Sequence, residues 1–176
     1  MSNRIALNKI DKTLLAFSSC FLIITSLISI WFVFIIINID LKLEFLIILV
    51  LIISMFIIGL TLWTNSVILS KKEVLRKREI NINLIICLIQ SVSIFMNGFR
   101  FKYLQGLECV FYINIDQTIS KVESGIVLPK LGFQFVFNFM STKGIFIGIN
   151  VIALIFSFFF LYIRGKYFHN KESVLT

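Results

Sequence analysis

The sequence predicts an all-α integral membrane protein with four transmembrane helices and a small extracytoplasmic segment, favouring β-structure, between helices three and four. Three observations support this fold class. Hydrophobic residues make up 59% of the 176 residues, well above the share usual in soluble domains. They gather in runs of about 20, the number that a helix needs to cross the hydrocarbon of a bilayer. The charged residues, 15% of the chain, lie between these runs.

The first two predicted spans, Leu14 to Ile37 and Phe45 to Leu69, are apolar runs without a charged residue. Arg4, Lys9 and Lys12 form a basic lead before the first run, as they would in a signal peptide. The run is too long for a signal peptide, and no small-residue cleavage site follows it. We therefore expect it to remain as a membrane anchor.

The third and fourth predicted spans are Ile80 to Phe99 and Ile145 to Ile163. The fourth is a clear apolar run. The third carries several amides, so its insertion depends on packing against the other helices. With these spans, residues 1–176 form a single polytopic membrane domain whose extracytoplasmic segment covers about 98–143.

Lys and Arg side chains set the predicted orientation, because they are retained on the cytoplasmic side. One side of the predicted topology holds Arg4, Lys9, Lys12, Lys71, Lys72, Arg76, Lys77, Arg78, Arg164, Lys166 and Lys171. The other side holds Lys42, Arg100, Lys102, Lys121, Lys130 and Lys143. The imbalance predicts a plasma (inner) membrane protein with both termini in the cytoplasm.

The segment over 98–143 shows a period of two. Its alternating runs begin at Phe99 (FRFKY), Val110 (VFYINID) and Phe133 (FQFVFNF). Such runs predict a two- or three-stranded antiparallel sheet, whose aromatic face must rest on the helix ends or the membrane because so small a sheet is unstable alone. The alternative is that Gly132 to Met140 continues the last span as a helix or lies at the interface.

Catalytic and metal-binding signatures are missing from the sequence. No Asp, Glu, Lys, Arg or His falls inside the four predicted spans, although proton relays and intramembrane hydrolases rely on such groups. His169 has no second ligand at metal-binding spacing, and the three cysteines form no C-x-x-C pair. The net charge of +8 comes from short clusters beside apolar runs, as membrane retention requires. We expect no enzymatic activity, no cofactor or metal, and no nucleic-acid partner.

Three amides of the third predicted span, Asn83, Gln90 and Asn97, are spaced by seven residues and share one stripe of a helix. Lipid cannot satisfy amide groups, so this stripe must face protein or water. We interpret the three amides and Asn150 of the fourth span as a candidate polar seam that joins helices by hydrogen bonds. The alternative is that the stripe lines a narrow polar path.

Two glycines, Gly144 and Gly148, form a small-x-x-x-small pair at the outer end of the fourth predicted span. Such pairs allow helices to approach closely. We therefore regard them as a candidate helix-packing site, within the bundle or in a dimer.

Large aromatic side chains outside the main spans are candidate contacts with a partner, since aromatic surface tends to anchor interfaces. These residues are Phe99, Phe101, Phe133, Phe135 and Phe137. Besides the lipid bilayer, the expected partner is another membrane protein or a second copy of the chain.

Two hypotheses about function follow. The first is a non-enzymatic membrane protein that acts by contact with another membrane protein, as an immunity, exclusion or accessory subunit. The second is a small channel or transporter subunit that oligomerises around the polar stripe. In layout the chain is similar to tetraspanins, although it lacks their Cys-Cys-Gly motif, and in size and orientation it resembles the inner-membrane immunity proteins that protect bacteria from pore-forming bacteriocins.

Overall fold

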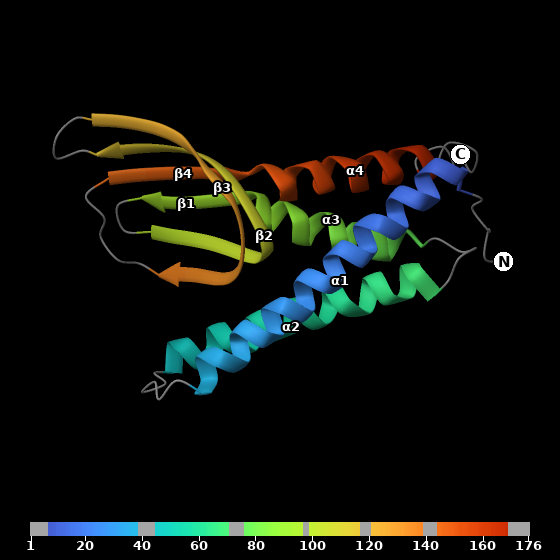
Figure 1. Cartoon of the computed structure of the whole chain (residues 1–176), viewed down its shortest axis with the longest axis horizontal. Coiled ribbons are helices and arrows are strands. Elements are labelled where there is room, and N and C mark those ends of the chain that lie inside the picture. The colour runs from blue at the N-terminus through green and yellow to red at the C-terminus, as the bar shows by residue number, and fades with distance from the viewer. Residues whose placement is uncertain are drawn as a thin grey trace, which may run out of the picture.

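A computed structural model describes residues 7–38, 45–70, 76–96, 99–116, 121–138 and 144–168. Its elements are α1 (Lys9–Asn38), α2 (Phe45–Ser70), α3 (Lys77–Ser91), β1 (Val92–Met96), β2 (Phe99–Asp116), β3 (Lys121–Asn138), β4 (Gly144–Asn150) and α4 (Val151–Phe168). The four strands form one antiparallel sheet. The predicted all-α fold with four transmembrane helices is therefore wrong, and the protein combines helices with a substantial sheet (Figure 1).

Within the described part of the chain, three helices are long and apolar enough to cross a membrane: residues Lys9–Ile35, Ile48–Ser70 and Val151–Phe168. The first two correspond to the first two predicted spans, where a continuous apolar run leaves no reason for the helix to stop. Both helices expose large apolar side chains along their length, including Phe17 and Trp31 on α1.

The third and fourth predicted spans each combine a helix with a shorter strand. In the run Ile80 to Phe99 the helix ends at Ser91, and Val92 takes an extended conformation with φ −120° and ψ 133°. In the run Ile145 to Ile163 the chain begins as β4 and becomes helical only at Val151. Alternating β-branched residues favour strands in both places, and pairing between β1 and β4 fixes them as such.

The sheet is built around β1 and β4, which pair with each other. One edge of β2 pairs with β3 from Arg100 to Asp116. Its other edge pairs with β1 near its start, at Phe99 to Lys102, and with β4 near its end, at Val110 to Asp116. The β2–β3 hairpin therefore bends around the β1–β4 pair (Figure 1).

The bend of β2 lies at Gly106 and at a register shift between Glu108 and Val110. Gly106 has a φ of 95°, in the left-handed region that favours glycine. The side chain of Thr25 on α1 lies where a Cβ atom of residue 106 would be. Helix α1 thus packs directly on the bend, and only glycine leaves room for this contact.

The two faces of the sheet differ in chemistry, because successive side chains of a strand point to opposite sides. We call one the apolar face: it carries Val92, Ile94, Met96, Phe111, Ile113, Ile145, Ile147, Ile149, Val122 and Ile126. We call the other the polar face: it carries Ser93, Phe95, Arg100, Lys102, Glu108, Tyr112, Asn114, Phe146 and Lys130.

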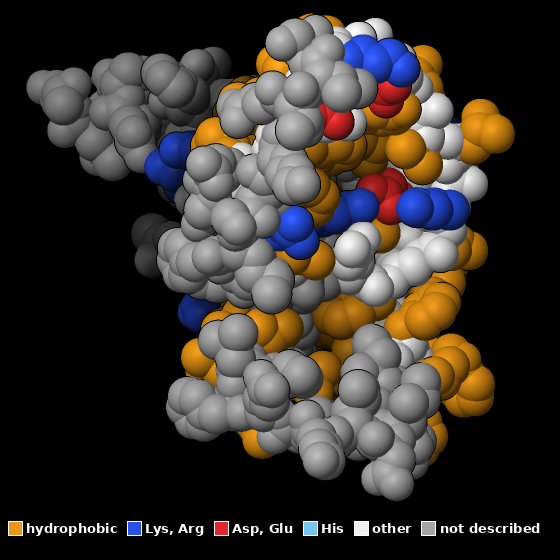
Figure 2. All heavy atoms as spheres, turned by 90° about the vertical axis from the view of Figure 1, so that its left-hand side faces the viewer, with side chains coloured by type: hydrophobic (Ala, Val, Ile, Leu, Met, Phe, Trp, Pro, Cys, Tyr) orange, Lys and Arg blue, Asp and Glu red, His pale blue; other side chains and the backbone are white. Residues whose placement is uncertain are grey.

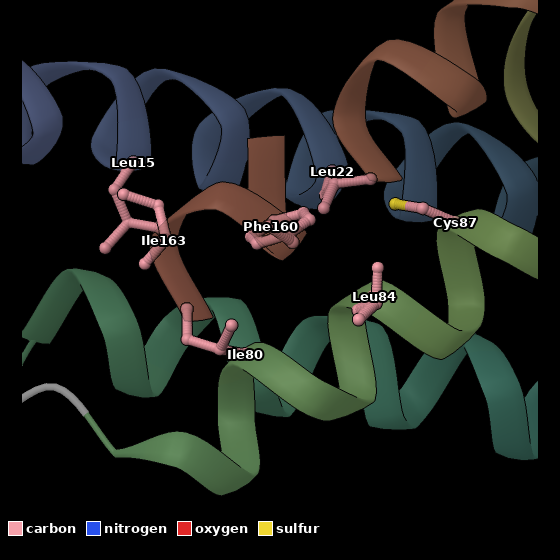
Figure 3. Packing of buried hydrophobic residues seen from close by; sticks show 7 residues of the cluster. All are labelled: Leu15, Leu22, Ile80, Leu84, Cys87, Phe160 and Ile163. Atoms are coloured by element: carbon pink, nitrogen blue, oxygen red, sulfur yellow. The ribbon is translucent and has the colours of Figure 1, made fainter. Parts of the chain in front are cut away.

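The helices enclose a mixed interior. Side chains from α1, α3 and α4 form a buried hydrophobic cluster in which Phe160 is central (Figure 3): Leu15, Leu22, Ile80, Leu84, Cys87, Phe160 and Ile163. The other buried positions of α1 and α2 are mostly small and polar: Ser18, Ser19, Thr25, Ser26, Ser29, Ser54, Thr61, Thr64 and Asn65. Small and polar residues inside with large apolar residues outside are typical of packed membrane helices.

Near the chain ends, α1 and α4 are joined by a polar cluster. The Asp11 carboxylate, buried in α1, accepts hydrogen bonds from Lys166 Nζ at 2.7 Å and from the Tyr167 hydroxyl at 2.6 Å. The amino end of α1, the carboxyl ends of α2 and α4, and the start of α3 all lie at one end of the molecule, opposite the sheet (Figure 1).

Candidate functional site

Asn83 of the predicted polar seam is fully buried on α3, where it faces α2. It forms a reciprocal pair with Asn65: Asn65 Nδ2 donates to Asn83 Oδ1 at 3.0 Å, and Asn83 Nδ2 donates to Asn65 Oδ1 at 3.2 Å. The Thr64 hydroxyl lies 3.1 Å from the same Asn83 oxygen. The amide groups of α2 and α3 therefore satisfy each other.

Gln90 lies in the last turn of α3 and joins a second polar group centred on Gln105 of β2. Gln90 Nε2 is 3.5 Å from Gln105 Oε1, which also accepts a 2.8 Å hydrogen bond from the Tyr103 hydroxyl. Gln105 Nε2 in turn donates to the Ser26 hydroxyl of α1. Burial raises the pKa of Tyr103, so its phenol stays a neutral donor. This group connects the bend of the sheet to the helices.

Of the two remaining seam candidates, only Asn150 is among the described residues, and its setting differs from the one predicted. Asn97 lies outside the described residues. Asn150 ends β4 and caps α4: its Oδ1 accepts from the backbone N–H of Ile152 at 3.3 Å and of Cys109 at 3.2 Å. It therefore holds the bend of β2 against the start of α4.

Gly144 and Gly148 are in strand β4 and cannot form a helix-packing pair, which corrects that prediction. A Cβ atom at Gly144 would lie 2.6 Å from the Ile115 carbonyl oxygen of β2. At Gly148 it would lie 2.9 Å from Val110 Cγ1. Both glycines serve close contact within the sheet.

The aromatic residues predicted as partner contacts fall on β2 and β3. Phe99 and Phe101 are half-buried, and Phe133 packs edge-on against Tyr103 with ring centroids 6.4 Å apart. Phe135 and Phe137 lie in β3, but their side chains are outside the described part of the chain. At least Phe133 therefore contributes to packing against the bend.

The polar face holds a charged cluster that sequence analysis missed. Glu108 is 2% exposed, and its carboxylate pairs with Lys102 Nζ at 2.5 Å and with Lys130 Nζ at 3.6 Å. Lys102 and Glu108 meet only because β2 bends between them; six residues of straight strand would hold them about 20 Å apart. In the sequence, the only indication was that Lys102 and Glu108, which have opposite charges, fall on the same face of a strand.

Aromatic rings lie on the same face. The Phe146 ring of β4 stacks between the rings of Phe95 on β1 and Tyr112 on β2, with centroid distances of 5.2 Å and 5.5 Å. Figure 2, which looks onto the end of the molecule that the sheet forms, shows basic and acidic side chains close together among hydrophobic ones. The polar face thus combines charge with a rigid aromatic stack.

Two buried polar atoms of this face have no hydrogen-bond partner among the described residues: Arg100 Nε and Glu108 Oε2. Two lysines, Lys102 and Lys130, surround the single carboxylate of Glu108, so the region beside the bend is basic overall. Such a surface suits carboxylates or carbonyl groups, which accept hydrogen bonds from Arg and Lys. At the far end of the strands, a hydrogen bond from Lys121 to Glu123 raises the pKa of that lysine.

Metal chemistry finds no support in the described ranges, where no three His, Cys, Asp or Glu side chains lie close enough to hold an ion. Cys87 is buried in the hydrophobic cluster, whereas Cys20 is exposed on α1.

No protein-family model, curated protein or solved structure matches this chain.

Proposed function

We propose that this protein is a non-enzymatic, multi-pass membrane protein that acts by contact with another membrane protein, as an immunity, exclusion or accessory subunit. The observation that carries the proposal is the polar face, which carries both Glu108 with its lysines and the stack of Phe95, Phe146 and Tyr112. Aromatic side chains are enriched at the centres of protein interfaces, and polar and charged groups surround them at the rim.

The proposed orientation has both termini in the cytoplasm and the end of the molecule that carries the sheet directed towards the outer side of the plasma membrane. The described basic residues at three helix ends support it, because these ends lie opposite the sheet: Lys9 and Lys12 at the start of α1, Arg76, Lys77 and Arg78 at the start of α3, and Arg164 and Lys166 near the end of α4. In this orientation the polar face is available to an outer partner, and its basic region selects a partner that offers carboxylate or carbonyl groups.

The second hypothesis, a channel or transporter subunit, has less support. Most buried hydroxyl groups of α1 and α2 donate to carbonyl oxygens of their own helix, as Ser26 does to Leu22 and Thr61 to Ile57. The Asn65–Asn83 amides are paired with each other. Hydroxyl groups whose protons are bonded within their own helix cannot also donate to a passing anion or water, and the two amides use a donor and an acceptor on each other.

Photocrosslinking of the full chain in its own cell membranes tests the proposal. A photoreactive amino acid at Asn114, on the polar face, should give one discrete adduct with another membrane protein, and one at Arg164, at the opposite end, should give none. Lys130→Gln should abolish the adduct at unchanged abundance, whereas the matched change Lys12→Gln should not. Adducts from Arg164 alone, or self-adducts alone, contradict the proposal. Ion flux into vesicles that contain only the purified chain would favour the channel hypothesis.

A further inference from the structure

We infer that β1 and β4 lie inside the membrane with the apolar face of the sheet against lipid acyl chains. The chain then crosses the bilayer four times, twice as helices (α1 and α2) and twice as helix–strand rods (α3–β1 and β4–α4). The partner of this face is the hydrocarbon of the bilayer, and no second protein is needed to cover it.

Length is the first argument. Helix α3 has 15 residues and reaches about 22 Å at 1.5 Å per residue, short of the roughly 30 Å of hydrocarbon. Its first turn is also charged, with Lys77, Arg78 and Glu79. The five residues of β1 add about 16 Å. Only the rod as a whole is long enough to cross.

The second argument is that the backbone groups of β1 and β4 do not need water as a hydrogen-bond partner. Each pairs on both edges: β1 with β2 and β4, and β4 with β1 and β2. Their backbone N–H and C=O groups are therefore hydrogen-bonded within the sheet, which is the condition for any strand in hydrocarbon. Neither strand contains a charged residue, whereas both β2 and β3 do.

The third argument is the continuity of exposed apolar surface. Across the sheet, Val92, Ile149 and Phe111 stand directly opposite one another on β1, β4 and β2. They are 37%, 40% and 43% exposed, and Ile147 in the next row is 46% exposed. Along the rods this surface continues onto the helices, through Ile85 and Leu88 of α3 and through Val151, Ile155 and Phe158 of α4. A surface that continues the lipid-facing side of a membrane helix has the same neighbour as that helix.

Quenching of a single tryptophan by lipids brominated on their acyl chains tests this inference. The native tryptophans, both exposed, are first replaced by Trp31→Phe and Trp63→Phe. Single tryptophans are then introduced as Ile147→Trp on the apolar face, Glu123→Trp on the polar face, and Ile155→Trp on α4 as the lipid-facing reference. Each full-length variant is reconstituted into phosphatidylcholine vesicles with and without bromine on the acyl chains.

We expect Ile147→Trp to lose the same fraction of its fluorescence to brominated lipid as Ile155→Trp, and Glu123→Trp to lose none. Aqueous iodide should quench only Glu123→Trp. Quenching of Ile147→Trp by iodide alone would place the apolar face in water and overturn the inference. Quenching by neither agent would mean that protein covers the face, and would overturn it equally. If Ile147→Trp elutes as aggregates in size-exclusion chromatography, Ile149→Trp replaces it on the apolar face, and the same outcomes decide.

Discussion

Replacing Asn83 by leucine tests whether the amide pair joins α2 and α3. The change removes three interhelical contacts, two with Asn65 and one with Thr64. Hydrogen bonds between membrane helices contribute about 0.6 kcal/mol each on average, so their loss costs about 2 kcal/mol. The Asn65 amide, left buried without these partners, adds a further cost of up to about 2 kcal/mol. We expect a total loss of about 2–4 kcal/mol in the free energy of unfolding.

The assay is reversible unfolding in mixed micelles of increasing dodecyl sulfate content. The control is Ile85→Leu, an exposed position on the same helix, which should cost less than about 0.5 kcal/mol. Asn65→Leu alone and with Asn83→Leu completes a double-mutant cycle, whose coupling should be about 1–2 kcal/mol. Equal effects of Asn83→Leu and Ile85→Leu, or strictly additive effects in the cycle, would refute the reasoning.

Three further predictions concern contacts around the sheet and the chain ends, all measured by the same unfolding assay. Gly106→Ala should lower the free energy of unfolding by about 1 kcal/mol or more, because Gly106 has a positive φ and contacts α1. Gly132→Ala, which meets only an ordinary contact, should be near neutral, and equal costs would contradict this account of the bend. Asn150→Ala should cost about 1–3 kcal/mol through loss of the α4 cap and of the bonds to β2, and an unchanged stability would argue against both roles. Asp11→Asn should lower the unfolding midpoint by weakening the ion pair with Lys166, and a midpoint equal to that of the unmodified protein would mean that the pair gives no net stabilisation.

The helices α1 and α2 could be predicted from the sequence, but the secondary structure of the other two predicted spans could not. An apolar run of 25 residues can only be a membrane helix in practice, and both early helices follow such runs. The run Ile80 to Phe99 is uncharged but less apolar, with several amides, and an uncharged run alone does not separate a buried helix from a buried strand. In β4 a signal was present: Ile145, Ile147 and Ile149 alternate with smaller or aromatic residues, and two glycines within five residues disfavour a helix.

The candidate site was harder to predict than the fold. Alternation identified much of β2 and β3, because the period of a strand is local in sequence. The ion pair of Lys102 and Glu108 depends on the bend at Gly106, and the stack of Phe95 and Phe146 depends on pairing between strands that are distant in the chain. Such long-range contacts have no local pattern to reveal them.

The order of strands in the sheet has a consequence for biosynthesis. The ribosome makes β1 directly after α3, but it makes β4, one of the two neighbours of β1, as the last of the four strands. Until β4 emerges from the ribosome, one edge of β1 has open hydrogen-bonding groups, and the β2–β3 hairpin has nothing to bend around. In the topology that we infer, the third crossing of the membrane would therefore be completed together with the fourth, after the intervening segment has been exported. A chain truncated before Gly144 would lack the partner that closes β1, and it should be recognised by the cell as an unfinished membrane protein and degraded.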